Sequence, residues 1–199
     1  MSETYERRAD YWTRDLADRS FEELIKDQLD TLGWPFKDQT ESHNRPDFLF
    51  RLPLRNKPVK VALEAKEKRQ HYRQGWVQEV DFPEELLLVQ DEVSARKLLV
   101  HAPRAFLLFW DHTVEMDPFV CFTIIDLFCQ PRVRIERPIN RQTRRVKAKW
   151  LLDRRNGRAF QHLRDVFAFI NTYLARDLGE EVRALQSHRP GAGESIACL

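Results

Sequence analysis

Two short segments with alternating apolar residues constrain this chain most. The segments Asp47–Leu52 and Val59–Lys66 each place apolar side chains at every second position, and Pro53–Pro58 lies between them. Alternation with a period of two is typical of strands that bury one face, and a short proline-bounded connection favours antiparallel pairing. The two segments therefore predict a β-hairpin with its turn over Pro53–Pro58.

The segments around this hairpin predict helices and further strands. Ser20 and Glu23 have the spacing of a capping box, so a helix is expected to begin at Ser20 and to stop at Gly33. Periodicity and composition predict the later elements as follows: a helix around Asp91–His101, buried strands over Arg104–Trp110 and Phe119–Phe128, and an amphipathic helix over about Gly157–Leu178. This order predicts an α/β fold with a mixed sheet.

A length of 199 residues favours one domain. We expect this domain to span 1–186, with its core over about 20–130. The small, polar segment 187–199 is expected to be a flexible tail.

The charge is distributed unevenly along the chain. The net charge is +2, but the segment 132–158 holds eleven basic residues and two acids, which makes it +9 and leaves −7 for the rest. Such a block indicates a face that binds a polyanion, although a solvated Arg-rich surface would have the same composition. Its candidate nucleic-acid-binding residues are Arg141, Arg144, Arg145, Lys147, Lys149, Arg154 and Arg155.

Several protein classes are excluded by composition. The apolar runs are far shorter than the roughly 20 residues that cross a bilayer, so no membrane association is expected. Six glycines leave no room for a glycine-rich phosphate loop. Three cysteines without a C-x-x-C pair suggest neither a disulfide framework nor a zinc site, which favours the reducing cytoplasm.

The residues with the clearest chemistry are Asp47, Glu64 and Lys66. Glu64 and Lys66 lie two positions apart on one strand, so their side chains leave the same face, and pairing of the hairpin would bring Asp47 beside them. Two close carboxylates repel each other unless a cation lies between them, and Mg²⁺ or Mn²⁺ suits such an oxygen-rich site. A surface ion pair of the Glu-x-Lys type is the plainer alternative.

This pattern resembles the signature of the PD-(D/E)xK nuclease superfamily, which has a restriction-endonuclease-like fold. The resemblance rests on Pro46-Asp47 followed by Glu64-Ala65-Lys66. The segment from Phe21 to Trp34 is also similar to the first helix of Mrr-like restriction endonucleases, and Glu22 there matches a glutamate that reaches the active site.

The resemblance implies a mixed four-stranded sheet flanked by α-helices and a metal-dependent DNA endonuclease that hydrolyses phosphodiester bonds with an activated water. Asp47, Glu64 and the carbonyl of Ala65 would bind Mg²⁺ or Mn²⁺, Lys66 would orient the water, and Glu22 would assist. RNA stays open as a substrate, and a homodimer is expected by analogy with nucleases that cut two strands. The alternative is a catalytically silent, nuclease-like subunit that binds nucleic acid or acts as a scaffold.

Overall fold

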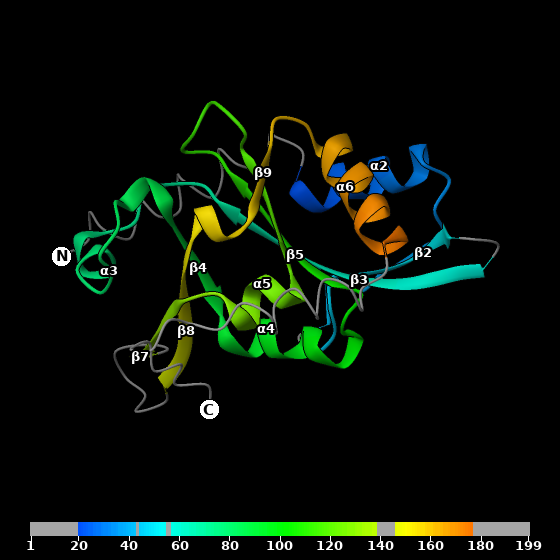
Figure 1. The fold of residues 1–199 in the computed structure, drawn as a ribbon. Helices are drawn as coiled ribbons and strands as arrows, with labels where there is room; N and C mark the ends of the chain where they lie inside the picture. Colours follow the sequence, from blue (N-terminus) through cyan, green and yellow to red (C-terminus); the bar gives the residue numbers. More distant parts are fainter. Residues whose placement is uncertain (1–19, 43, 55–56, 139–145, 177–199) are drawn as a thin grey trace.

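The computed structural model describes residues 20–42, 44–54, 57–138 and 146–176, which form a mixed α/β fold (Figure 1). Its central sheet has six strands in the order β1-β2-β3-β5-β6-β9, in which β3 and β5 are parallel and the other neighbours antiparallel. Its strands are β1 (Phe36–Asp38), β2 (Phe48–Leu54), β3 (Lys57–Lys68), β5 (Ala105–Asp111), β6 (Phe119–Thr123) and β9 (Arg158–Phe160). The predicted mixed central sheet flanked by helices is confirmed, but with six strands rather than the four that the resemblance implied.

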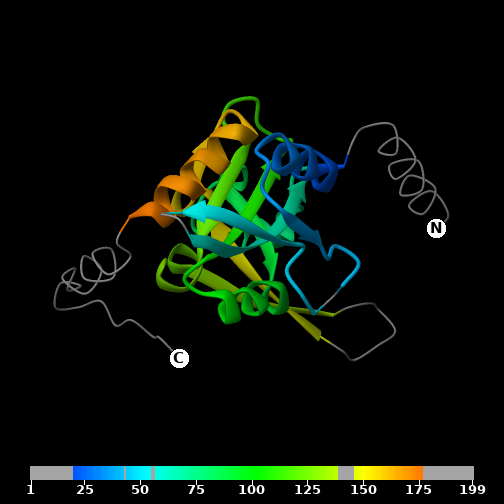
Figure 2. The same ribbon diagram turned by 90° about the vertical axis from the view of Figure 1, so that its right-hand side faces the viewer.

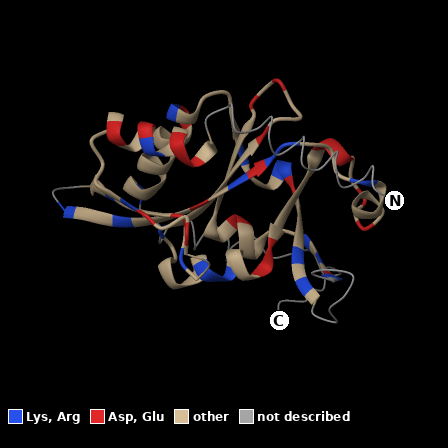
Figure 3. Ribbon diagram, turned by 180° about the vertical axis from the view of Figure 1, so that it is seen from behind, with Lys and Arg blue, Asp and Glu red and all other residues tan. Residues whose placement is uncertain are grey.

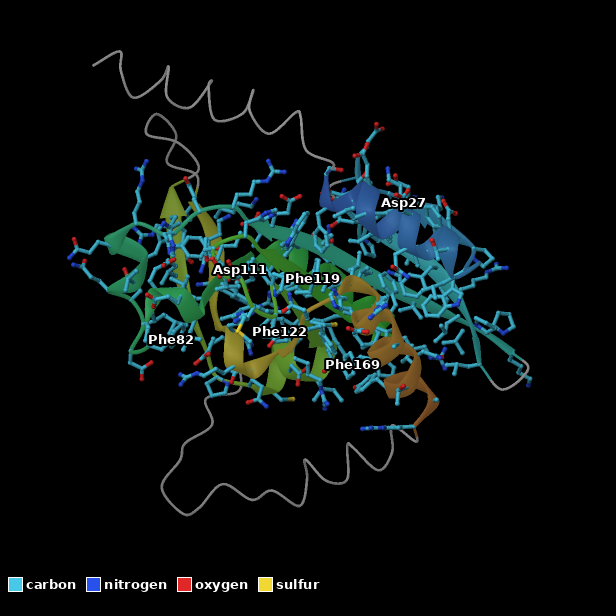
Figure 4. The ribbon with its side chains drawn as sticks, turned by 90° about the horizontal axis from the view of Figure 1, so that it is seen from above. Asp27, Phe82, Asp111, Phe119, Phe122 and Phe169 are labelled. Carbon is cyan, nitrogen blue, oxygen red and sulfur yellow. The ribbon has the colours of Figure 1, made fainter. Side chains whose placement is uncertain are left out.

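Helices cover both faces of the central sheet (Figure 2). On one face lie α2 (Phe21–Thr31) and α6 (Leu163–Ala175), and on the other lie α4 (Glu92–Leu98) and α5 (Ile124–Cys129). Alternate residues of each strand enter the two apolar cores: on β6, Phe119 packs with the α2 and α6 side and Phe122 with the α4 and α5 side (Figure 4). A short helix, α3 (Gln74–Val77), follows β3.

The predicted first helix is confirmed. Ser20 accepts a hydrogen bond from the backbone N–H of Glu23, and the Glu23 side chain accepts one from the N–H of Ser20, as a capping box requires. Gly33, just after the helix, has a φ of +64°, a conformation that glycine adopts without strain.

The predicted hairpin is confirmed, but its strands are longer than expected. Pro53 pairs with Pro58 inside the β2–β3 ladder, so these prolines do not belong to the turn. The ladder to β1 ends at Phe50 and the ladder to β5 begins at Ala62, so the end of the hairpin has no outer neighbours. A proline there removes no outward hydrogen bond of the sheet.

Two later predictions need correction. The predicted strand Phe119–Phe128 ends at Thr123, because Thr123 and Asp126 form a second capping box that starts α5. The predicted helix Gly157–Leu178 begins only at Leu163, since Arg158–Phe160 pairs with β6 as β9. The predicted tail 187–199 and the helix end beyond Arg176 lie outside the described residues.

The basic segment contributes to a second sheet that the sequence did not predict. This sheet has the order β4-β8-β7, with β4 (Leu87–Asp91), β7 (Arg132–Pro138) and β8 (Val146–Asp153) all antiparallel. Trp150 of β8 is buried beside Phe128 of α5, so the second sheet packs on the α5 side of the central sheet. None of the described helices has the length and apolar composition of a membrane span.

Candidate active site

Asp47 and Glu64 meet where β2 begins. Because Phe48 pairs with Leu63, Asp47 lies beside Glu64 and Ala65 at the next position of the hairpin. The Oδ2 atom of Asp47 accepts a hydrogen bond of 2.8 Å from the backbone N–H of Ala65. Asp47 is 9% exposed and Glu64 is fully buried, so the fold holds two carboxyl groups together away from water.

This proximity changes the acidity of Asp47. Burial, followed by the charge of Glu64, raises the pKa of Asp47 to about 6, although the Ala65 N–H and the charges of Lys66 and Lys97 act in the opposite direction. A nearby cation would favour the ionised form again.

Two lysines neutralise Glu64. Lys66 Nζ lies 3.1 Å from Oε1, and Lys97 Nζ, from α4, lies 2.7 Å from Oε2. Neither oxygen of Glu64 has a hydrogen bond of good geometry within the described part of the chain. Glu64 is therefore held by two ion pairs, one at each of its oxygens.

The donor set fits Mg²⁺ or Mn²⁺ better than zinc. The described residues contain no group of three or more His, Cys, Asp and Glu side chains that could hold a metal ion. Structural zinc sites need such a group, whereas Mg²⁺ binds through one or two carboxylates and keeps several waters. The buried pair Asp47 and Glu64 would supply the two carboxylates of such a site, with Lys66 and Lys97 beside the oxygens of Glu64.

Lys66 is the accessible cation nearest to the carboxylate pair. Its side chain is 35% exposed. Lys68, two residues further on, is fully buried, with Nζ 3.6 Å from Asp111 and 3.5 Å from Glu84. Asp111 lies near the centre of the molecule in Figure 4. Lys68 therefore belongs to an internal ion cluster, and Lys66 remains free to meet a ligand.

Glu22 is not joined to this group by a contact among the described residues. Helix α2 packs on the face to which Leu63 and Ala65 point, whereas Glu64 and Lys66 lie on the other face. The start of α2 is fixed instead by Glu67, whose Oε1 accepts a hydrogen bond of 3.0 Å from the N–H of Phe21. The assisting role of Glu22 stays a prediction.

The structure separates the candidate nucleic-acid-binding residues into three sets. Arg141, Arg144 and Arg145 lie outside the described residues. Lys147 and Lys149 lie on β8, where both form ion pairs with Asp91.

Arg154 and Arg155 follow the other end of β8. The Arg154 side chain donates to the carbonyl of Asp117, and Arg155 is paired with Asp153 at 2.6 Å. Among the described residues of the segment, Lys149 senses the charge of Lys66: burial, followed by that charge, lowers the pKa of Lys149. Within the described part of the chain, no ion pair joins the basic segment to Asp47 or Glu64, so the expected link between them stays a prediction.

The sequence did not single out Lys97. Its helix was predicted, but helical spacing does not show which strand a given face will contact. A lysine near the C-terminal end of a helix is usually explained by the favourable interaction of its charge with the helix dipole. Only the packing of α4 on β3 brings its ammonium to Glu64.

Comparisons with known proteins give little guidance. No protein-family model matches the chain, and no curated protein matches it. A solved structure with a similar chain course is Hjc, a Holliday junction resolvase from the archaeal hyperthermophile Archaeoglobus fulgidus. It shares 13% sequence identity at a TM-score of 0.35, over 67% of this chain and 94% of the resolvase.

Proposed function

We propose that the protein is a metal-dependent phosphodiesterase, and specifically a DNA endonuclease. The observation that carries the proposal is the buried carboxylate pair Asp47 and Glu64 with the accessible ammonium of Lys66 beside it. A fold gains no stability from holding two carboxyl groups together in its interior, so such a pair is more typical of a functional site.

The order of elements supports the assignment to restriction-endonuclease-like nucleases. The described chain runs from α2 through three antiparallel strands, then through α3 and β4 of the second sheet, to α4 and to β5, which is parallel to β3. The Pro-Asp and Glu-x-Lys motifs fall at the meeting point of the second and third strands.

Asp47, Glu64 and the carbonyl of Ala65 would hold Mg²⁺ or Mn²⁺. When bound, the ion would lower the pKa of a water and offset negative charge on the phosphate. Lys66, fixed against Glu64, would orient the attacking water and stabilise charge that develops on the phosphate oxygens. Lys97, 2.7 Å from Oε2 of Glu64, would hold the Glu64 side chain in place.

The test is cleavage of plasmid DNA and of branched DNA with Mg²⁺ or Mn²⁺. The wild-type protein should cut, whereas Asp47→Ala and Lys66→Ala should not. Lys57→Ala, at the distant and exposed end of β3, serves as a matched lysine control and should cut like the wild type. Equal activity in Asp47→Ala and the wild type would refute the site.

One observation favours a catalytically silent, nucleic-acid-binding protein as the second candidate. Lys66 and Lys97 already neutralise Glu64, so the pair can persist without a metal. DNA binding by the wild type without cleavage of any substrate in Mg²⁺ or Mn²⁺ would support this candidate.

A further inference from the structure

A groove of about 670 Å³ opens next to the carboxylate pair. Its walls come from β1, the residues before β2, the exposed part of the β2–β3 hairpin and the end of α4. Among the described residues, its lining contains no Asp or Glu but includes Lys37, Arg45, Arg51, Lys60, Lys97 and His101. Since Lys97 also contacts Glu64, and Pro46 of the lining precedes Asp47, the groove adjoins the candidate active site.

Apart from Lys97, which pairs with Glu64, the lysines and arginines of the groove have no acidic partners among the described residues. Within the described residues, Lys37, Arg45, Arg51 and Lys60 form no ion pair, although most lysines and arginines around the second sheet do. Arg51 pairs directly with Lys60 across the β2–β3 ladder, and both are exposed. Like charges directly opposite each other on a sheet are destabilising, so this pair favours the arrival of an anion.

The charged residues also lie on the correct face of the sheet. Lys37 pairs with Leu49, Leu49 with Ala62, and Arg51 with Lys60, so these residues share the face of Glu64 and Lys66. Lysines and arginines recur along the β2–β3 hairpin (Figure 3). The row of positive charge therefore crosses three strands.

Two further polar side chains, Gln39 and His101, line the groove. Gln39 is 93% buried, and its side-chain oxygen has no hydrogen-bond partner in the described structure. Burial, followed by the charge of Lys60, lowers the pKa of His101, so an arriving anion would favour its protonation. The free oxygen of Gln39 is an acceptor, so it would take a donor such as a water or a base N–H, and the cations of the groove are the groups that would contact phosphate oxygens.

We infer that this groove binds the phosphate backbone of a DNA strand that continues to Asp47 and Glu64. The inference deepens the proposed function and rests on it. A linear polyanion matches a row of unpaired cations that extends over three strands, whereas a single phosphate would use only part of it. The groove, rather than Arg154 and Arg155, then supplies the main phosphate contacts, because those two arginines already bind within the protein.

The test is fluorescence anisotropy with a labelled DNA duplex in EDTA, where binding is separate from cleavage. The groove variant is Arg51→Ala with Lys60→Ala. The control is Lys57→Ala with Arg164→Ala, which removes two exposed cations that lie outside both the groove and the basic segment. Thermal melting checks that each variant is folded.

We expect the groove variant to bind at least about tenfold more weakly at about 50 mM salt. Its slope of log affinity against log salt should be shallower by about 1.8, because each lost phosphate contact contributes about 0.9 for a duplex. The control should bind like the wild type. A groove variant with the affinity and slope of the wild type would overturn the inference. So would a groove variant that loses binding to polyglutamate, a polyanion without phosphate, but still binds DNA like the wild type. Cleavage plays no part in this readout, so failure of the proposed function would appear separately, in the Asp47→Ala assay.

Discussion

Replacing Asp47 with asparagine should stabilise the protein at neutral pH. Burial and the charge of Glu64 raise the pKa of Asp47 from 3.8 to about 6, so the folded state holds its charged form unfavourably. A difference of about 2 pKa units, at about 1.36 kcal/mol each, sets the gain from removing this charge at no more than about 3 kcal/mol. The asparagine oxygen can still accept the hydrogen bond from Ala65.

The sign of the effect follows from proton linkage. Because the pKa of Asp47 is higher in the folded state, the fold binds the proton of this carboxyl group more tightly than the unfolded chain does. The stabilisation from this proton is fully present below about pH 4 and is lost as the pH rises to about 6. The advantage of the asparagine variant should therefore be largest at pH 7 and should vanish near pH 4.

Urea unfolding of both proteins from pH 4 to pH 7 measures this difference. The comparison cancels other titrating groups, including Asp126, whose pKa is also raised by burial. Saturating Mg²⁺ should stabilise the wild type, by about 2.7 kcal/mol at 100 times its dissociation constant, and should not stabilise the variant. A variant that is no more stable than the wild type at pH 7, with an unchanged pH dependence, would refute the reasoning.

Two other substitutions probe the packing around the site. Lys97→Ala should lower the free energy of unfolding by about 3 kcal/mol, because it removes one partner of the buried Glu64. Urea unfolding measures this loss, and addition of Mg²⁺ should restore part of it. Gly157→Ala should lower the free energy of unfolding by about 1–3 kcal/mol, since the added methyl would lie 2.7 Å from Val120. The control, Gly75→Ala, places its methyl within 4 Å of no atom and should leave thermal unfolding almost unchanged.

Local patterns in the sequence predicted the elements that carry the candidate site. Alternation identified β2 and β3, and the face shared by Glu64 and Lys66 followed directly from it. The Ser20 capping box located the start of α2 because this signal depends only on residues three apart.

Contacts between distant segments could not be predicted in the same way. The second sheet depends on pairing between Leu87–Asp91 and Val146–Asp153, which no local pattern specifies. Lys97 reaches Glu64 only through the packing of α4, and the groove forms only when β1, the hairpin and α4 meet. The charge count identifies 132–158 as a basic segment. It does not show that several of those cations pair with acids or carbonyls of the protein.

The most direct measurement is the single-turnover rate of DNA cleavage as a function of Mg²⁺ concentration, for the wild type and for Glu64→Gln. Glu64→Gln keeps the size of the side chain and removes the charge that Lys66 and Lys97 surround. We predict no cleavage by the wild type in EDTA, a rate that rises with Mg²⁺ and saturates, and no cleavage by the variant at any concentration. Cleavage by the variant at the wild-type rate, or a wild-type rate that does not depend on the metal, would contradict a metal-dependent nuclease site at Asp47 and Glu64.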